Sequence, residues 1–248
     1  MRHTVHAVET DTDRDRNEER LTRRGTIARL GGLVVASFGA AGLEAALSDP
    51  SQAAGSGPAA VSAGLVRCVL TPEQTEGPFY VNGEKTRHDL REGKPGARLT
   101  LRTTVVDAST CKPIKGAAVD IWHADAGGVY SGVNGVTGTF LRGLQPTNAH
   151  GLAQFVTLFP GWYQGRTTHI HVKVHLGGNV VHTGQLYFPE AAVTAAGKLS
   201  PYNQRGEPST RNADDAIFRN GGKNSLMAVS RDPAGAFVGT IMMGVHRS

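Results

Sequence analysis

Residues 160–174 read PGWYQGRTTHIHVKV, a glycine-bounded turn that leads directly into an alternating segment. The alternation predicts a β-strand, in which successive side chains point to opposite faces. His169 and His171 therefore project together on one face, and the β-branched residues project on the other. Neutral imidazole suits iron, copper, zinc and nickel, and a strand fixes the angle between two such ligands. The pair is a candidate metal site, with two ordinary half-exposed strand histidines as the simpler alternative.

The composition is that of an ordinary globular protein with many strands. Of the 248 residues, 39% are hydrophobic and 19% are charged, which is enough to build a core without special help. The 32 glycines and 12 prolines separate short β-branched runs, which favours strands and turns over helices. Besides the histidine strand, we expect strands at 99–106, 117–123, 139–143, 152–157 and 180–188, a helical turn at 214–218, and a closing hairpin formed by 226–230 and 236–245.

These elements predict an all-β sandwich or barrel that forms one domain over residues 65–248. The strands at 99–106 and 117–123 form either a hairpin or a connection between two sheets. Tyr130 follows the second of these strands in a loop, and Tyr163 lies in the turn before the histidine strand. Loops at one end of a sandwich can bring the two phenols to the two histidines.

The first 53 residues resemble an export signal. A polar, charge-mixed start is followed by the arginine pair Arg23-Arg24 and by a mild Ala/Gly/Leu/Val run over residues 30–43. This order is typical of a twin-arginine signal peptide, and the run falls short of the ~20 residues that span a bilayer, although a membrane anchor is the alternative. The small residues up to Ala53 predict cleavage, with residues 59–60 as a second choice, and residues 54–64 read as a flexible lead-in. We expect a secreted protein with no stable membrane insertion after cleavage.

The net charge lies in the part that would remain after cleavage. Residues 54–248 carry 19 Lys and Arg against 13 Asp and Glu, a formal charge of +6. This charge can attract carboxylate or phenolate substrates over a long range, or it can simply be a soluble basic surface. No nucleic-acid module or clustered basic helix is present in the sequence, so we do not expect nucleic acid as a partner.

The two cysteines fit an oxidising compartment. Cys68 and Cys111 are the only cysteines, and neither has metal-binding spacing. An even pair in an exported protein predicts a disulfide, with two buried free thiols as the alternative. Cys111 lies in a polar turn at residues 107–113, where burial of a thiol is not expected.

Two phenols and two imidazoles form a chemically distinctive ligand set. Phenolate is a hard anionic ligand, so a shell made of Tyr130, Tyr163 and the two histidines favours iron(III) over iron(II). Tyrosinate is a known iron ligand in haem proteins such as catalase. Either tyrosine can equally be an amphipathic ring at the edge of the core.

Four motifs in order resemble the intradiol ring-cleavage dioxygenases, the family of the catechol, protocatechuate and hydroxyquinol enzymes. The similarity runs from about residue 71 to about residue 188, which is most of the domain. The motifs are Thr75-Glu76-Gly77-Pro78-Phe79-Tyr80, the stretch Asp120-Ile121-Trp122-His123-Ala124-Asp125 that leads to Gly128-Val129-Tyr130-Ser131, Phe140-Leu141-Arg142-Gly143, and Pro160-Gly161-Trp162-Tyr163 with Arg166 and His169-Ile170-His171.

The resemblance implies a β-sandwich core and one non-haem iron(III) ion. It makes Tyr130, Tyr163, His169 and His171 the ligands, Arg166 and Gln185 active-site residues, and Tyr80 a lining residue of the substrate pocket. The implied substrates are O2 and a small aromatic diol of the catechol type, which binds as a dianion while Tyr163 leaves the metal with one proton. The ring then opens between the two oxygenated carbons to give a cis,cis-muconate.

The sequence leaves the oligomeric state, the substrate and one competing function open. Catechol-cleaving members carry an N-terminal helical dimerisation region, and the residues before Leu65 do not resemble it, so the oligomeric state is open. Export suggests extracellular phenolic compounds as substrates. A secreted β-sandwich binding module that has lost the metal is the competing hypothesis. An extradiol iron(II) enzyme is disfavoured because no carboxylate lies at ligand spacing from His169 and His171.

Overall fold

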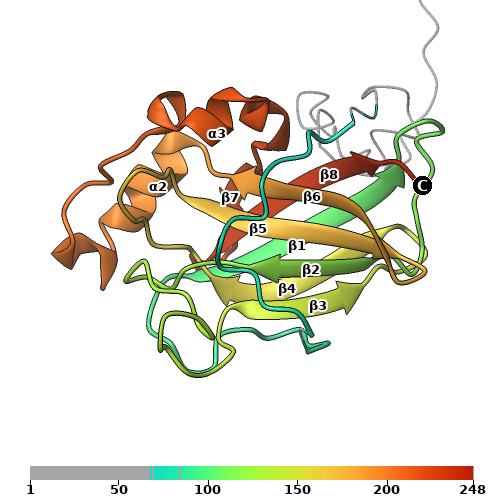
Figure 1. Ribbon diagram of the computed structural model, residues 1–248. Helices are drawn as coiled ribbons and strands as arrows, with labels where there is room; N and C mark the ends of the chain where they lie inside the picture. The colour runs from blue at the N-terminus through green and yellow to red at the C-terminus, as the bar shows by residue number, and fades with distance from the viewer. Residues whose placement is uncertain (1–67, 69, 84, 248) are drawn as a thin grey trace, which may run out of the picture. The chain divides into compact units, whose positions relative to one another are not determined.

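Two four-stranded sheets pack face to face in the computed structural model, which describes residues 68, 70–83 and 85–247 (Figure 1). The expected signal, lead-in and start of the domain, residues 1–67, lie outside the described residues. The strands are β1 (Arg98–Asp107), β2 (Ala118–Trp122), β3 (Arg142–Pro146), β4 (Leu152–Leu158), β5 (His169–Leu176), β6 (Asn179–Tyr187), β7 (Ala228–Arg231) and β8 (Phe237–Val245). The helical elements are α2 (Glu190–Gly197), α3 (Ala216–Arg219) and the 3-10 turns η2 (Tyr202–Gln204), η3 (Asn212–Asp214) and η4 (Gly222–Ser225).

The strand order is β4-β1-β8-β7 in one sheet and β3-β2-β5-β6 in the other. All neighbours are antiparallel except β1 and β8, which pair in parallel. The link from β1 to β2 therefore crosses between sheets, which decides between the two alternatives for these strands. The all-β sandwich is confirmed.

The core lies between the sheets and uses one face of each. On β5 the apolar face is Ile170, Val172 and Val174, all with no exposed surface, and on β1 it includes Leu99 and Leu101. Each fully buried aliphatic side chain stabilises the fold by about 1.5–3 kcal/mol. The opposite face of β5 is thus left for the two histidines.

The structure corrects two expectations about secondary structure. The strand expected at 139–143 begins only at Arg142 and runs to Pro146 as β3, because Leu141 has a left-handed backbone with φ +58°. The helix α2 was not expected from the sequence, since Pro189 and a short alanine-rich run give little helical periodicity. The other strands expected within the described residues are present.

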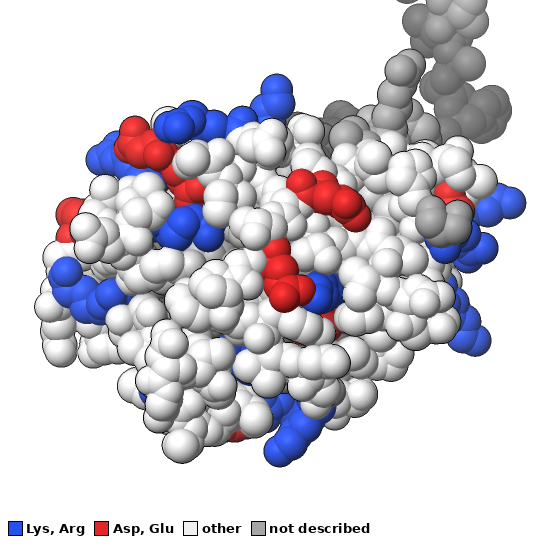
Figure 2. All heavy atoms as spheres, viewed as in Figure 1, with Lys and Arg blue, Asp and Glu red and all other residues white. Residues whose placement is uncertain are grey.

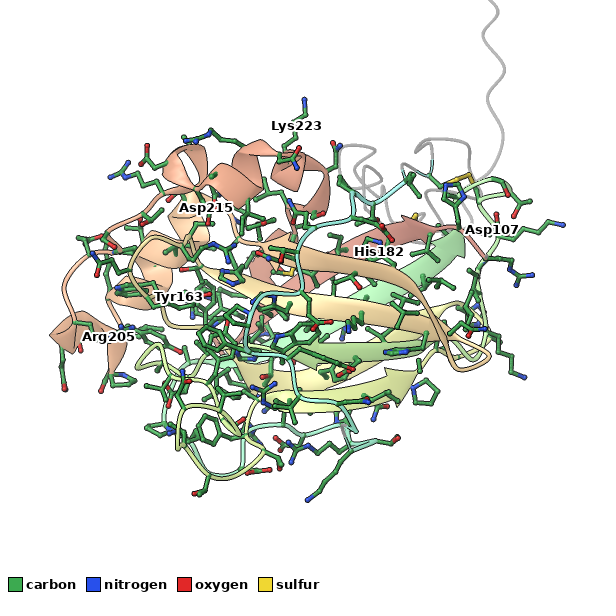
Figure 3. The ribbon with its side chains drawn as sticks, in the orientation of Figure 1. Asp107, Tyr163, His182, Arg205, Asp215 and Lys223 are labelled. Atoms are coloured by element: carbon green, nitrogen blue, oxygen red, sulfur yellow. A yellow bond between two sulfur atoms is a disulfide. The ribbon has the colours of Figure 1, made fainter. Side chains whose placement is uncertain are left out.

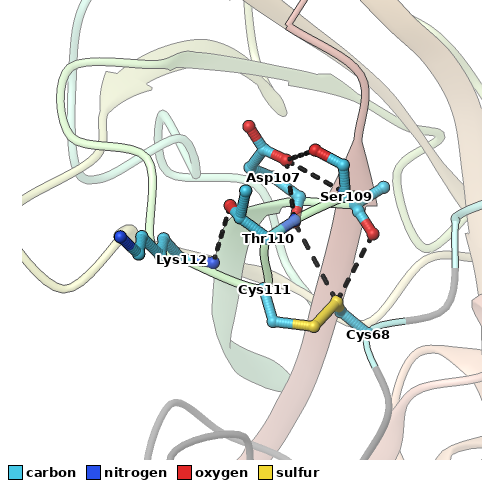
Figure 4. The surroundings of a disulfide bond; sticks show 7 residues. Cys68, Asp107, Ser109, Thr110, Cys111 and Lys112 are labelled. Carbon is cyan, nitrogen blue, oxygen red and sulfur yellow. Dashed lines mark hydrogen bonds between the residues drawn. A yellow bond between two sulfur atoms is a disulfide. The ribbon is translucent and has the colours of Figure 1, made fainter.

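A disulfide joins Cys68 to Cys111, with 5.5 Å between their Cα atoms (Figure 4). The turn after β1 that carries Cys111 is held by Asp107, whose Oδ1 accepts hydrogen bonds from the backbone N–H groups of Ser109 and Thr110. Closing a loop of 43 residues stabilises the fold by roughly 4 kcal/mol on the chain-entropy model. The disulfide prediction is confirmed.

The charged side chains on the face in Figure 2 are scattered. Among the described residues on that face, Lys and Arg lie mostly around the rim and do not gather into one patch. Within the described part of the chain, no helix is long and apolar enough to span a membrane.

The loop at 123–131 and the turn at 159–168, which carry the two tyrosines, pack backbone against backbone. Gly161 N donates to Asp125 O at 3.0 Å. A Cβ atom on Gly161 would lie 2.5 Å from the carbonyl oxygens of both Asp125 and Ala126, well inside van der Waals contact. Only glycine allows this approach.

Arg205, just after η2, joins the same two loops. Its Nη1 donates to Ala126 O at 2.8 Å, and its Nη2 donates to Trp162 O at 2.7 Å. The guanidinium also lies over the Trp162 ring, 5.1 Å from its centroid. One side chain from the C-terminal part of the chain thus ties together the segments that carry Tyr130 and Tyr163.

We expect Gly161→Ala to lower the free energy of unfolding by about 1–3 kcal/mol, because the new methyl group meets backbone that cannot move aside. Chemical denaturation of the purified variant measures this loss. Gly197→Ala is the matched control, since a Cβ there meets only the Trp162 ring at 3.8 Å. Equal stability of the two variants would show that the loops do not pack as described.

We also expect His182 to make the stability depend on pH. Its side chain is 2% exposed on β6, its Nε2 has no hydrogen-bond partner among the described residues, and burial lowers its pKa to about 4. The unfolded chain, with a pKa near 6.5, binds more protons between these values, so stability falls as the pH drops from about 6.5 to 4.

His182→Phe removes this titration, and stability measured at pH 7 and pH 4.5 should differ less in the variant, by up to about 3 kcal/mol. The exposed His150, replaced in the same way, is the control. An unchanged difference between the two pH values in His182→Phe would contradict the assignment.

Candidate metal centre

The two histidines of β5 point to the face of the sheet that lies away from the core. His169 is 3% exposed and His171 is 1% exposed, and their Nε2 atoms are 3.1 Å apart. His171 is flanked in the sheet by Trp122 of β2 and Gln185 of β6. The Trp122 ring stacks on the His171 ring at 5.0 Å with an interplanar angle of 8°. The predicted convergence of the two imidazoles is confirmed, and the half-exposed alternative is wrong.

The two tyrosines join the histidines from separate loops. The Oη of Tyr163 lies 3.2 Å from His169 Nε2 (Figure 3). The ring of Tyr130 lies 5.9 Å from the Tyr163 ring and 6.0 Å from the His171 ring, both edge to face. Two phenols and two imidazoles, called here the four-donor cluster, are therefore gathered at one end of β5.

The protonation of the imidazoles suits metal binding. His169 Nδ1 lies 2.6 Å from Thr167 O, so this nitrogen carries the proton and Nε2 keeps its lone pair. Burial, helped by the charge of Arg166, lowers the pKa of His169 to about 3. Burial and the neighbouring His169 lower the pKa of His171 well below its usual range. Both rings are neutral near pH 7, which is the form that binds metal ions.

A bound cation would stabilise the ionised form of both phenols. Burial raises the pKa of both Tyr130 and Tyr163 above the ordinary value. Tyr130 is only 4% exposed, and its hydroxyl makes no hydrogen bond of normal geometry among the described residues, although it lies close enough to Tyr163 for the two pKa values to influence each other. A buried polar atom without a partner is costly, and a metal cation next to it both removes that cost and stabilises the phenolate.

The donor set fits iron(III). Two anionic oxygen ligands and two nitrogen ligands favour the higher oxidation state of iron. Within residues 68, 70–83 and 85–247, no three His, Cys, Asp or Glu side chains are arranged to hold a metal ion, so the site depends on its phenols. The residues present therefore fit the cofactor that the sequence resemblance implies.

Arg142 fixes the chain just after Tyr130. This arginine is 1% exposed, and its Nη2 and Nε donate to Ser131 O at 2.6 and 3.0 Å. Ser131 Oγ in turn donates to Phe140 O at 2.6 Å. Together with Arg205 on the other side of the loop, these bonds leave Tyr130 little freedom.

Arg166 and Gln185 lie beside the four-donor cluster, as the resemblance implies. Arg166 Nη1 is 3.4 Å from His169 Nε2, and its Nη2 donates to Gln185 Oε1. Gln185 is fully buried, and its Nε2 donates to Thr75 O at 3.0 Å. The guanidinium therefore lies beside the Nε2 nitrogen of His169, one of the four donors.

Tyr80 is further from His171 than Trp122 is, because the Trp122 ring packs against both of these residues. It packs on Trp122 at 4.8 Å between centroids, and its hydroxyl donates to Asp120 Oδ2 at 3.2 Å. The Nζ of Lys173 lies 3.6 Å from the centre of the Tyr80 ring. Substrate contact by Tyr80 stays a prediction, because Trp122 separates it from His171.

Two contributors to the site were missed by sequence reasoning. Phe79 stacks on Tyr130 at 4.5 Å and meets Tyr163 edge to face at 6.2 Å. Asp215, 1% exposed, forms an ion pair with Arg166 Nε at 2.9 Å. Burial alone would raise the pKa of Asp215, but the hydrogen bond from Thr167 N and the Arg166 guanidinium hold it below its ordinary value. The sequence signal for Asp215 is that of a helix cap, an Asp directly before a helical turn, and it does not indicate a contact with Arg166.

Comparison with known proteins agrees with this site. A family profile described as "Dioxygenase" matches residues 75–199, which include all four donors, Arg166 and Gln185. The structure of an intradiol ring-cleavage dioxygenase from Tetranychus urticae is 38% identical, with a TM-score of 0.68 over 72% of this chain and 95% of that one.

Two further relatives are similar. The dioxygenase domain of a dioxygenase carbohydrate-binding protein fusion from Streptomyces sp. SirexAA-E is 36% identical, with a TM-score of 0.57 over 73% of this chain and all of that one. Catechol 1,2-dioxygenase 1 of Acinetobacter lwoffii is 31% identical over 150 residues, which are 56% of this chain and 47% of that protein. The chain thus spans about half the length of the curated relatives that it matches.

The profile match covers half of the chain, and the identity to the mite protein extends over nearly all of that structure. Since the matched segment also holds the four-donor cluster, the chain belongs to the intradiol ring-cleavage dioxygenase family.

Proposed function

We propose that the protein is a non-haem iron(III) dioxygenase that inserts both atoms of O2 into a catechol-type aromatic diol and opens the ring between the two hydroxylated carbons to a cis,cis-muconate. The observation that carries the proposal is the convergence of two phenols and two neutral imidazoles on one point beside a guanidinium. The relatives named as intradiol and catechol dioxygenases support it.

Tyr130, Tyr163, His169 and His171 would hold the ion. Bound iron(III) supplies a Lewis acid and a one-electron acceptor for the diol. The two histidines are the rigid part of this shell, because their strand is packed into the core on its other face. A rigid shell keeps the ligand geometry through the reaction.

The two phenols differ in a way that assigns a role to each. Tyr130 is buried and enclosed by Phe79, whereas Tyr163 is half-buried on a turn and its Oη lies close to His169. Tyr163 would therefore be the phenolate that accepts one substrate proton at its Oη, while Tyr130 stays in place. General acid–base steps of this kind contribute about 10²–10⁴-fold to a rate.

Arg166 would bind the deprotonated diol. A fixed guanidinium that is shielded from water stabilises negative charge on the substrate oxygens and on the opening ring. Its Nη1 lies 3.4 Å from His169 Nε2, the nitrogen that would hold the metal ion. The Nη1 protons would then be available to a substrate oxygen.

We further propose export of the protein and action on extracellular phenolic compounds. The disulfide between Cys68 and Cys111 supports an oxidising compartment, and the twin-arginine-type start of the chain supports the route.

The first experiment is the visible spectrum of the purified domain, with an iron assay, before and after anaerobic addition of catechol. We expect a broad tyrosinate-to-iron(III) band that shifts when catechol binds, and ring-opened product once O2 is admitted. In Tyr130→Phe the band should be lost or weakened. In Tyr163→Phe it should change, with turnover falling by about 10²-fold.

Tyr202→Phe is the matched control, because that phenol donates to Phe159 O, outside the four-donor cluster. A colourless protein that takes up no iron would overturn the proposal in favour of a binding module that has lost the metal. Unchanged turnover in Tyr163→Phe would contradict the role of Tyr163 alone.

A further inference from the structure

Asp215, labelled in Figure 3, is a buried carboxylate that the C-terminal segment places against Arg166 and Thr167. Its Oδ2 accepts two hydrogen bonds, from Arg166 Nε at 2.9 Å and from Thr167 N at 2.9 Å. Its Oδ1 accepts from Ile217 N at 2.7 Å and Phe218 N at 3.1 Å, which caps α3. One carboxylate oxygen therefore binds Arg166 and Thr167 beside the site, and the other caps the helix α3.

The guanidinium of Arg166 is held on two of its three nitrogens. Asp215 holds Nε and Gln185 holds Nη2. The third nitrogen, Nη1, lies 3.4 Å from His169 Nε2. A planar guanidinium that is fixed at two nitrogens has a fixed direction for the third, so Asp215 and Gln185 together aim Nη1 at the four-donor cluster.

The same oxygen of Asp215 is also linked to His169, through the backbone N–H and C=O groups of Thr167. Thr167 N donates to Asp215, and Thr167 O accepts from His169 Nδ1 at 2.6 Å. This second bond sets the imidazole tautomer and the ring direction. Hydrogen bonds from neighbouring residues to metal ligands orient those ligands, and their loss commonly weakens metal affinity or activity by 10–100-fold.

The segment that carries Asp215 is itself anchored to the site. Thr167 Oγ1 donates to Asn212 Oδ1 at 2.7 Å, and Asn212 Nδ2 donates to Phe188 O at 3.0 Å. Glu190 Oε1 accepts from Asn212 N at 2.7 Å. These bonds keep η3 against the end of β6, so the position of Asp215 is determined by the fold and not by a mobile loop.

We propose that Asp215 is a positioning residue of the ring-cleavage site, which aims the Arg166 guanidinium at the metal-bound diol and steadies the Thr167 peptide behind His169. The inference rests on the proposed function. It assigns a role in the reaction to the C-terminal segment, which lies beyond the family match at residues 75–199.

A double-mutant cycle with Asp215→Asn and Arg166→Gln tests this proposal. In Asp215→Asn we expect the anaerobic affinity for catechol and kcat/KM each to fall by about 10-fold or more, the loss of one charge-assisted hydrogen bond. In the Arg166→Gln background the same substitution should cost much less, because Asp215 acts through Arg166. When the variants are loaded at saturating iron, the iron content and the tyrosinate band of the substrate-free protein should remain.

Asp215→Ser separates positioning from folding, because a serine still caps α3 but cannot pair with Arg166. We expect it to reproduce the loss of catechol affinity, because both Asp215→Ser and Asp215→Asn keep the helix cap and remove the ion pair with Arg166. The matched control is Asp214→Asn, which removes the same charge from an exposed neighbour and should leave both affinity and kcat/KM as in the wild type.

The inference would be overturned if both Asp215 variants bound catechol like the wild type, or if their losses were as large in Arg166→Gln as in the wild-type background. The latter result would make Asp215 purely structural. A wild-type protein that binds no iron and opens no ring would instead overturn the proposed function, and the inference with it.

Discussion

The two faces of β5 carry different tasks, and the rest of the structure depends on this division. One face buries Ile170, Val172 and Val174 between the sheets, and the other presents His169 and His171. A slip of one residue in the register would place the imidazoles in the core and the aliphatic side chains at the site. The packing energy of the core is therefore also what fixes the position of the two imidazoles. The Thr167 carbonyl then sets the ring direction of His169.

The other parts of the site come from loops that remote residues hold in place. Arg205 ties the loop of Tyr130 to the turn of Tyr163, and Asp215 pairs with Arg166. Each anchor is charged, and each makes bonds to backbone or to a partner of opposite charge. Buried polar groups are tolerated when they are paired in this way. The Tyr130 phenol, in contrast, is buried without a hydrogen bond of normal geometry among the described residues, a condition that favours a cation beside it.

Strand prediction succeeded where the pattern was local. The alternation around residues 99–106 and 169–174 reports directly which face is buried, and both strands are present. It failed at residues 139–143, where Leu141 adopts a left-handed backbone that its sequence does not signal. It also gave no sign of α2, a helix that forms because it packs against the sandwich and not because of its own periodicity.

Sequence alone determined that His169 and His171 share a face, since the period of two is a property of any extended backbone. With the family motifs it also selected the tyrosines, Arg166 and Gln185 as candidates. Only the tertiary structure decided how these groups meet, and that Arg166 pairs with Asp215 across 49 residues of sequence. The reason is physical: side-chain direction along a strand is set by local covalent geometry, whereas a contact between distant segments depends on how the whole chain packs.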